Sequence, residues 1–523
     1  MPAKALMIQG TASNVGKSLL CTALCRLFSR DGYTVAPFKA QNMALNSFST
    51  ADGEEIGRSQ AVQAEAAGVR PLVEMNPILL KPDARAGCQV VVMGRPLGLM
   101  SPERYETFKD HAFGVIEEAF GRLAASHDLI VIEGAGSPVE MNLKDRDLAN
   151  MRVAAMANAP VLLVGDIDRG GLFAAIIGTM ALLTDQERRL MKGFVVNRFR
   201  GDLELLRPGL RFIEAETGRP VLGVIPYLDD LPFPAEDSLA RVRWPAEGPG
   251  HTQLRIGVMA LPHLSNDTDF DLLAREPGVS LRFLDRPEEA AEVDLLILPG
   301  SKNTIDDLEY LRTRGFESAI QDHRRRGGAV VGICGGYQML GHLIRDPCGV
   351  EGEIREAKGF GLLDVSTTLT REKRVAQVRA VPCNHLGWQV SPPLEGYEVH
   401  LGETMLGERA LPMFRLLGDG GVSAERLDGA VSSDRIVWGT YLHGLFDHPG
   451  LRRQLLNALR RRKGLVPLEG PLGDRGVSFR SALYDRLEEV VRSHLDLSLL
   501  YEIVGLHMPT RKGGERGAQP RVS

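Results

Sequence analysis

The chain has few cysteines, no long hydrophobic run and no excess of positive charge. Its six cysteines among 523 residues are irregularly spaced, which argues against a disulfide framework. No apolar stretch approaches a membrane span, and the apolar segment near the first residue is too short for a signal peptide. The formal net charge of −5 gives no general reason to expect nucleic acid as a partner. These absences favour a cytoplasmic protein without a membrane or nucleic-acid partner.

Length and patterning predict more than one domain, because 523 residues are too many for a single core. Strands alternate with helical segments on both sides of a stretch rich in proline and glycine, which predicts two α/β domains with doubly wound, mainly parallel sheets. The polar stretch 262–269 is expected to line a domain interface. The expected division is a first domain at 1–236, a linker at 237–252, a second domain at 253–450, its helical extension at 451–507 and a disordered tail at 508–523.

A glycine-bounded loop follows the first predicted strand, residues 5–9. The loop runs from Gly10 to Gly16 and continues through Lys17 and Ser18 into a helical segment. Backbone N–H groups in such a loop can surround phosphates, while Lys17 neutralises charge and Ser18 offers a hydroxyl group to Mg²⁺. The sequence therefore predicts a site for ATP and Mg²⁺. A glycine-rich turn without a ligand is the alternative.

Three acidic residues are candidates for metal binding. The apolar strand predicted at 129–132 ends in Glu133, and a carboxylate at the carboxyl edge of a parallel strand is well placed for Mg²⁺ opposite a phosphate loop. Glu133 is therefore the first choice, with an exposed acid in a glycine turn as the alternative. Glu55 and Asp52, beyond the strand predicted at 34–38, are two further candidates, and the sequence does not choose between them. A solvated loop is the alternative for either.

A cysteine stands at a second junction between a predicted strand and a helix. Residues 329–333 predict a buried strand, and the two glycines after Cys334 predict a sharp turn into a helix. At such an elbow the sulfur projects away from the backbone, and the N–H groups of the helix favour a thiolate and then an oxyanion. A buried structural cysteine is the alternative. His443, at the end of the strand predicted from 436, could serve as the base of a cysteine nucleophile.

The strand predicted at 295–298 leads into Gly300 and Ser301, a source of a second oxyanion N–H. Together with G-x-C-x-G-x-Q-x-L-G and a late Y-x-H, this turn resembles the class I glutamine amidotransferase domain. The resemblance implies these roles: Cys334 as the nucleophile that forms a glutamyl thioester, His443 as the base, Gly335 with the Gly300 turn as the oxyanion hole, and Gln338 as a neighbour of the substrate glutamine. Leu445 stands where that family commonly has a glutamate that orients the histidine.

Nearly the whole chain resembles the cobyric acid synthase family. The likeness rests on F-K-A-Q-N-M-A-L-N-S at 38–47, E-I-G-R-S-Q at 55–60 and Y-L-H-G-L-F at 441–446. The phosphate loop, with five residues between its glycines, and E-G-A-G from Glu133 resemble the dethiobiotin synthetase group of ATPases, in which a lysine at the position of Lys39 faces the phosphates.

The family resemblance implies amidation of the b, d, e and g carboxylates of adenosylcobyrinic acid a,c-diamide, driven by ATP and glutamine, with no tightly bound prosthetic group. One alternative is a cobyrinic acid a,c-diamide synthase, from which the loop at 39–47 differs. Another is an ATP-dependent amidotransferase for a different acid, such as a cell-wall precursor. A nucleotide-dependent regulatory protein is the alternative outside the enzymes.

Overall fold

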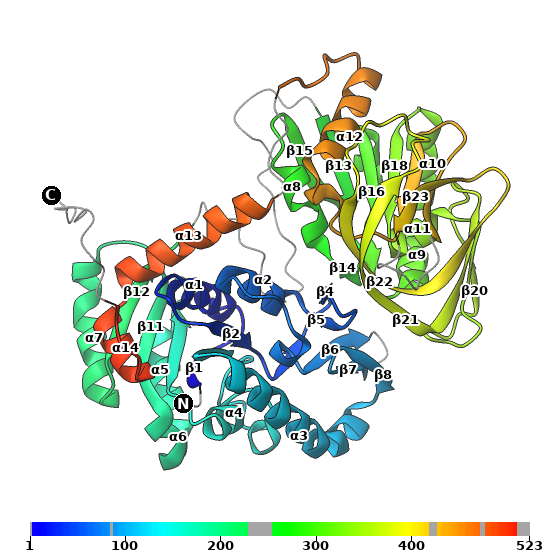
Figure 1. Ribbon diagram of the computed structural model, residues 1–523. Helices are drawn as coiled ribbons and strands as arrows, with labels where there is room; N and C mark the ends of the chain where they lie inside the picture. The colour runs from blue at the N-terminus through cyan, green and yellow to red at the C-terminus, as the bar shows by residue number, and fades with distance from the viewer. Residues whose placement is uncertain (1–2, 84–86, 229–253, 418–425, 471–475, 510–523) are drawn as a thin grey trace.

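The computed structural model describes residues 3–83, 87–228, 254–417, 426–470 and 476–509. Figure 1 shows two domains, the first blue to cyan and the second green to orange, with the red C-terminal helices lying on the first. The expected linker at 237–252 and nearly all of the expected tail at 508–523 lie outside the described residues.

The first domain is built on a parallel sheet with the strand order β12-β11-β10-β1-β9-β2. Its strands are β1 Lys4–Gly10, β2 Val35–Phe38, β9 Leu129–Glu133, β10 Val161–Asp166, β11 Met191–Phe199 and β12 Val221–Pro226. The chain extends from the central β1 toward both edges, so the loop after β1 lies near the point where the strand order reverses, and ligands of such sheets bind there. This confirms the expected doubly wound parallel sheet.

Helices cover both faces of this sheet, which explains why its strands are apolar throughout. Leu6 and Ile8 of β1 belong to one buried cluster and Met7 to the cluster on the opposite face. Helix α3 begins after Ser101, whose hydroxyl accepts the Arg104 N–H. The helices are α1 Lys17–Arg30, α3 Pro102–Ser126, α4 Met151–Met156, α5 Leu172–Leu182, α6 Asp185–Leu190 and α7 Leu203–Thr217.

An insertion between β2 and α3 forms two small sheets that the sequence patterning did not predict. One has the order β3-β6-β7-β8 and the other pairs β4 with β5. The insertion contains β3 Gln41–Met43, β4 Ser47–Ser49, β5 Glu55–Gly57, α2 Arg58–Ala67, β6 Ile78–Asp83, β7 Gly87–Val92 and β8 Arg95–Met100. In Figure 1 it lies on the side of the first domain that faces the second.

The second domain has a larger mixed sheet, with parallel strands in the order β15-β13-β16-β18-β25 and a largely antiparallel continuation through β24, β23 and β21. The parallel strands are β13 Leu254–Met259, β15 Val279–Leu284, β16 Leu295–Leu298, β18 Ala329–Ile333 and β25 Val437–Thr440. The continuation comprises β19 Leu343–Arg345, β20 Glu356–Lys358, β21 Val365–Pro382, β22 Leu394–Leu406, β23 Leu411–Leu417 and β24 Arg426–Val431. The long β21 and β22 pair with each other and extend toward the first domain (Figure 1).

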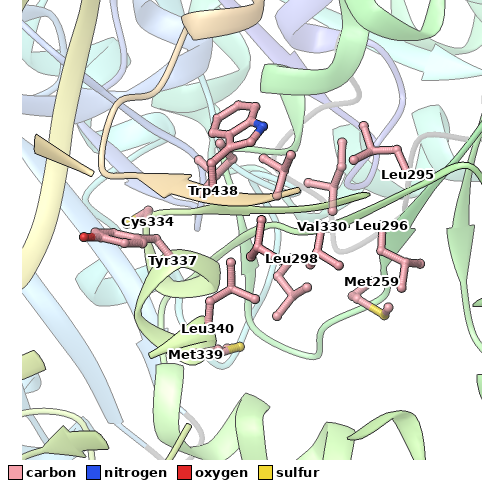
Figure 2. Close-up of a cluster of buried hydrophobic side chains, with 14 of the residues drawn as sticks. Met259, Leu295, Leu296, Leu298, Val330, Cys334, Tyr337, Met339, Leu340 and Trp438 are labelled. Atoms are coloured by element: carbon pink, nitrogen blue, oxygen red, sulfur yellow. The ribbon is translucent and has the colours of Figure 1, made fainter. Parts of the chain in front are cut away.

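Helices flank the parallel part of the second domain: α8 Asp271–Ala274, α9 Thr304–Thr313, α10 Phe316–Arg325, α11 Gly335–Leu340 and α12 Pro449–Arg462. A short ribbon, β14 Leu264–Ser265 with β17 Gly300–Ser301, closes its carboxyl edge. Figure 2 shows Leu298, Val330 and Trp438 among the buried apolar side chains that surround the junction carrying Cys334. The nucleophile candidate therefore sits on a closely packed support.

The structure corrects the expected helical extension of the second domain. Helix α12 does pack in the second domain's core, through Leu455 among others. Helices α13 Val477–His494 and α14 Leu497–Val504 instead pack on the first domain, where Leu487 and Tyr501 share a buried cluster with α1. Helical periodicity identifies an apolar face but does not say which domain covers it, so the sequence could not decide this point.

Candidate active site

The glycine-bounded loop joins the end of β1 to the start of α1. Gly16, directly before α1, has φ 100°, which L side chains rarely adopt. A side chain there would also overlap the Asn197 amide, whose Nδ2 atom donates to the Val15 carbonyl oxygen at 2.8 Å. A Cβ atom at Gly10 would stand 2.7 Å from Val15 Cγ2. Both glycines are therefore required for the path of this loop.

Lys17, the first residue of α1, turns its ammonium group back over the loop. Its Nζ atom donates to the carbonyl oxygens of Ala12 at 3.0 Å and Gly136 at 3.3 Å. The start of α1 adds N–H groups and the positive end of the helix dipole. The loop thus combines a buried ammonium group with a helix N-terminus, an arrangement that suits phosphate.

Ser18, Lys39 and Glu133 meet beside the loop. The Glu133 Oε1 atom accepts hydrogen bonds from Ser18 Oγ at 2.7 Å and from Lys39 Nζ at 2.8 Å. The other oxygen accepts one from Gln63 Nε2 at 2.5 Å. Burial alone would raise the pKa of Glu133, but the Lys39 charge and these hydrogen bonds hold it below its ordinary value.

This donor set fits Mg²⁺. The Ser18 hydroxyl and the Glu133 carboxylate are hard oxygen donors, and proteins commonly hold Mg²⁺ through one or two such groups together with substrate phosphates. The side chain of Gln63, which binds Glu133, also has a buried Oε1 atom that makes no hydrogen bond among the described residues. An additional oxygen is therefore available next to the carboxylate.

Glu55 does not join that group. Its Oε1 atom forms an ion pair with Lys81 and its Oε2 atom lies 2.6 Å from Lys373 Nζ, so ammonium groups occupy both oxygens. This arrangement corrects the metal-ligand role considered for Glu55, because two adjacent cations disfavour a third. Asp52 is exposed and pairs with Arg70 at 2.5 Å. The sequence could not show these pairings, since Lys373 comes from the other domain.

Cys334 occupies a strained junction between β18 and α11. Its φ of 52° and ψ of −111° are rare for a residue with a side chain, and its own N–H donates to the Thr440 carbonyl oxygen at 2.8 Å. A side chain at Gly336 would overlap the Leu298 carbonyl group, so the turn has room only for glycine there. The elbow predicted from the two glycines is thus present, and α11 begins at Gly335, the residue after Cys334.

The oxyanion-hole candidates lie together around this junction. A Cβ atom at Gly335 would stand 3.0 Å from the Ser301 backbone nitrogen, and one at Gly300 would stand 3.3 Å from His443 Cε1. The Ser301 hydroxyl donates to Asp307 Oδ2 at 2.6 Å, whereas the Ser301 backbone nitrogen lies against Gly335. The turn after β16 therefore sits against the elbow, where its N–H groups could contact a reacting carbonyl oxygen.

Gln338 lines the same pocket, but other protein groups engage its amide. Its Nε2 atom donates to the Leu401 carbonyl oxygen at 2.9 Å and to the Tyr441 hydroxyl at 3.0 Å. Its Oε1 atom accepts from the Thr304 hydroxyl at 3.0 Å. Gln338 thus shapes the pocket that contains Cys334, and its polar atoms are fixed by neighbouring side chains and backbone.

Asp269 orients His443, a role that no sequence motif indicated. The His443 Nδ1 atom lies 2.7 Å from Asp269 Oδ2, and the Gly444 N–H donates to Asp269 Oδ1 at 2.9 Å. Asp269 belongs to the 3₁₀ turn η3 (Asp267–Phe270), in the polar stretch after β13. Leu445, at the position where a glutamate is common, is buried and apolar. The only sequence signal for Asp269 was the polarity of that stretch.

The pKa of His443 reflects this partner. Burial opposes the charged imidazolium, but the Asp269 carboxylate and the hydrogen bonds to Asp269 and Cys334 raise the pKa of His443 to about 10. The histidine is therefore suited to keep a proton that it takes from the thiol. Tyr397 stacks on the imidazole with ring centroids 5.2 Å apart, which fixes the plane of the ring.

The first domain reaches the same histidine through Asn266. The Asn266 Nδ2 atom lies 3.3 Å from His443 Nε2. On its other side, Asn266 Oδ1 accepts the Ser47 N–H at 3.2 Å, and its own N–H donates to Asn46 Oδ1 at 2.8 Å. Asn46 Nδ2 also donates to Asp267 Oδ1 at 3.1 Å. The stretch at 262–269 thus does contact the other domain, as expected.

Comparison with known families covers both domains. Residues 6–239 match the family described as the CobQ/CobB/MinD/ParA nucleotide binding domain. Residues 255–450 match the family described as the CobB/CobQ-like glutamine amidotransferase domain. Among the helices that the structure describes, none combines the length and apolar character required to cross a membrane.

Full-length relatives are also similar to this chain. The cobyric acid synthase of Pelotomaculum thermopropionicum is 51% identical, over 99% of this chain and 100% of its own. That of Sorangium cellulosum is 51% identical, over 97% of this chain and 99% of its own. That of Desulforamulus reducens is 48% identical, over 96% of this chain and 98% of its own. The likeness therefore includes both domains and the C-terminal helices.

Proposed function

Because this chain belongs to the cobyric acid synthase family of ATP-dependent amidating enzymes, we propose that it amidates the b, d, e and g carboxylates of adenosylcobyrinic acid a,c-diamide with glutamine as the nitrogen donor. The observation that carries the proposal is the pocket around Cys334, which is lined by residues of both domains, Ser47 and Lys81 from the first and Lys373 from the second among them. Because the first domain forms part of the wall of this pocket, ammonia released at Cys334 would form next to the domain that is proposed to use it.

In the second domain, His443 takes the Cys334 proton and the thiolate attacks the carboxamide carbon of glutamine. Asp269 holds Nδ1 of the imidazole, so Nε2 faces the thiol. The carbonyl oxygen becomes an oxyanion beside the N–H groups of Gly335 and the Gly300 turn. His443 returns its proton to the departing nitrogen, which leaves as ammonia, and water then hydrolyses the thioester to glutamate.

In the first domain, a carboxylate of the corrinoid attacks the γ-phosphate of ATP. The bond between the γ-phosphate and ADP breaks, so ADP leaves and an acyl phosphate forms, and ammonia then displaces phosphate from it to give the amide. Lys17 and Lys39 are positioned to balance the charge of the transferring phosphoryl group. Ser18 and Glu133 would hold Mg²⁺, which supplies electrostatic stabilisation of the phosphates when bound. The contact between Lys39 and Glu133 keeps that carboxylate ionised.

Mass spectrometry of the corrinoid tests the proposal. Wild-type protein incubated with adenosylcobyrinic acid a,c-diamide, ATP, Mg²⁺ and glutamine should give four successive acid-to-amide mass steps. Cys334→Ser should give none with glutamine and should regain them with an ammonium salt, because only the nitrogen supply is lost. If folded wild-type protein consumes ATP and glutamine on another acid while this corrinoid stays unchanged, the substrate assignment is wrong.

A further inference from the structure

A cavity larger than the Cys334 pocket lies at the domain boundary, next to Asp269, Tyr397 and Gly444. These three residues contact or adjoin His443, but the described residues that line the cavity include neither His443 nor Cys334. Its volume is about 320 Å³, compared with about 40 Å³ for the Cys334 pocket. Sites for small molecules have volumes of about 300–1,000 Å³. We call this space the boundary cavity, and it has room for a small metabolite.

Both domains and α13 line the boundary cavity. Part of the lining is apolar, with side chains from α2 and the segment after it, among them Val62, Val69 and Pro71. The rest is largely polar, and its charged side chains come from α2, from the second domain and from α13. Apart from Asp269, the charged lining residues are Arg58, Glu65, Glu395, Asp447 and Arg480. A molecule in the cavity would thus contact both aliphatic and charged groups.

Arg58, the first residue of α2, stands out among these groups. Its Nε atom is buried and has no hydrogen-bond partner in the part of the chain that the structure describes. The guanidinium carbon lies over the Phe48 ring, 5.3 Å from the centroid, a contact that satisfies none of the N–H donors in the plane of the group. A buried donor without an acceptor is costly, and a carboxylate is the acceptor that fits a guanidinium group best. Arg58 therefore marks a place for a carboxylate.

The other charged side chains favour a ligand that also carries a positive charge. Arg480 contacts Glu65 at 2.9 Å and Asp447 at 3.0 Å, so two carboxylates share one guanidinium group. The exposed Glu395 adds a further carboxylate. A ligand with a carboxylate alone would meet this surplus of negative charge, whereas an ammonium group on the same ligand would be attracted by it. An α-amino acid carries both groups.

A ligand in the boundary cavity would act on His443 through residues that line the cavity. Asp269 binds Nδ1 of the imidazole through one oxygen and the Gly444 N–H through the other. An ammonium group beside Asp269 would compete with the imidazolium for the charge of that carboxylate, so the histidine would hold the thiol proton less well. Tyr397 stacks on the imidazole, and its ring centroid lies 5.5 Å from that of Phe48. Filling the cavity should therefore slow glutamine hydrolysis.

We propose that the boundary cavity binds an α-amino acid, with its carboxylate at Arg58 and its ammonium group among the carboxylates around Arg480, and that the bound ligand slows the glutaminase reaction. The ligand is L-glutamate, because the reaction at Cys334 releases it. This choice rests on the proposed function, whereas the recognition of an α-amino acid rests on the cavity. Binding is reversible and changes no covalent bond.

Calorimetric titration with L-glutamate tests the site. The protein is first alkylated at Cys334 with 6-diazo-5-oxo-L-norleucine, a glutamine analogue that fills the catalytic pocket, so that only binding elsewhere is measured. Alkylated wild-type protein should bind one L-glutamate per chain. Arg58→Met should weaken this binding about tenfold or more, because the carboxylate loses its guanidinium partner. The absence of binding to wild type, or unchanged affinity in a folded Arg58→Met variant, would overturn the proposal.

The matched control is Arg152→Met. Arg152 also lies over a phenylalanine ring of the first domain, with its guanidinium carbon 3.7 Å from the Phe113 centroid, but it is not among the residues lining the boundary cavity. This variant should bind L-glutamate as wild type does. Equal losses of affinity in Arg152→Met and Arg58→Met would show that the loss is not specific to the cavity, and the proposal would fail.

Two related compounds test the chemistry of the ligand. Glutarate has both carboxylates of glutamate but no ammonium group, and it should bind about threefold more weakly or worse, since it lacks the attraction to the surrounding carboxylates. Equal binding of glutarate and L-glutamate would overturn the α-amino acid as the ligand class. Tighter binding of L-glutamine than of L-glutamate would overturn the choice of glutamate.

The effect on catalysis is measured with unmodified protein and glutamine alone. L-Glutamate should lower kcat for glutamine hydrolysis, because it binds outside the Cys334 pocket, and Arg58→Met should reduce this inhibition. Inhibition that only raises KM and is equal in both proteins would place glutamate in the catalytic pocket and overturn the regulatory role.

A folding defect and a wrong function are separable from failure of the site. If Arg58→Met does not fold, Arg58→Lys decides, since it retains the charge but loses the planar set of donors. Weaker binding in that variant supports the proposal, and wild-type affinity overturns it. If the diazoketone does not react with Cys334 in folded wild-type protein, the proposed glutaminase fails, and titration of the unmodified protein still decides whether the cavity binds L-glutamate.

Discussion

The Nδ1 atom of His443 lies 2.7 Å from Oδ2 of Asp269, although 174 residues separate them in the chain. The contact supplies the orientation that a glutamate at the position of Leu445 would give. It also joins two connecting segments of one domain, since His443 follows β25 and Asp269 lies in η3, after β13 and β14. In the proposed function Asp269 is therefore the third member of a triad with Cys334 and His443, and it comes from the start of the second domain.

Asp269→Asn should lower glutaminase turnover by about 100-fold or more, because the imidazole loses the charge that favours its protonated form. The pKa of His443 should fall from about 10, so the alkaline limb of the pH profile should move to lower pH. Glutamate release measured across the neutral and alkaline range checks this. Asp267→Asn is the matched control, since Asp267 lies in the same turn and binds Asn46 instead of the histidine. Equal rates and profiles in wild type and Asp269→Asn would contradict the triad.

Glu133→Gln should abolish ATP-dependent amidation and leave glutamate release intact. It should also destabilise the first domain in a pH-dependent manner. The folded-state pKa of Glu133 is below its ordinary value of 4.5, so its ionised form stabilises the fold above that pH, and this contribution is lost as the pH falls through the lowered pKa. The difference in unfolding free energy between wild type and Glu133→Gln should therefore be largest above the ordinary pKa and shrink in acid. Urea titrations at several pH values measure it, and a difference that grew in acid would refute the assignment.

Gly16→Ala should prevent nucleotide binding and destabilise the protein by about 1–3 kcal/mol, because alanine is strained at this backbone angle and would overlap Asn197. Gly32→Ala is the matched control. Gly32 has a similar φ of 95°, but no atom lies within 4 Å of the place that a Cβ atom would take, so only the backbone cost of about 1 kcal/mol remains. Calorimetric titration with ATP and thermal unfolding distinguish the two. Tight ATP binding by Gly16→Ala would show that this loop does not bind the nucleotide.

Leu487→Ala tests the assignment of α13 to the first domain. Leu487 is fully buried against α1, and its truncation should cost about 2–5 kcal/mol. Hydrogen exchange should then accelerate in β1 and β9. Leu455→Ala, in α12, removes an equally apolar side chain from the other domain and should accelerate exchange in β13 and β16 instead. The same exchange pattern in both variants would mean that the two cores do not unfold separately.

The parallel strands and their site residues could be predicted because burial on both faces produces apolar runs, and ligands of such sheets gather where these runs end. Cys334 and Glu133 were proposed as site residues in this manner. The strands of β3 to β8 and the long β21 and β22 were not, because β3, β4 and β5 have only three residues each, and much of β8, β21 and β22 is partly exposed and mixes apolar with polar residues. Asp269 and Glu55 depend on partners that only tertiary folding brings near, so no local pattern could assign their roles.

The return of α13 and α14 to the first domain bears on how the protein is made. A ribosome releases the N-terminal strands long before these helices, so the first domain cannot complete its core until the second has been synthesised. The core that packs against α1, the helix after the phosphate loop, is thus completed only after the segment that carries Cys334 has been synthesised. A ribosome that stops early would leave a fragment with an exposed apolar face on α1, which the cell's proteases and chaperones can recognise.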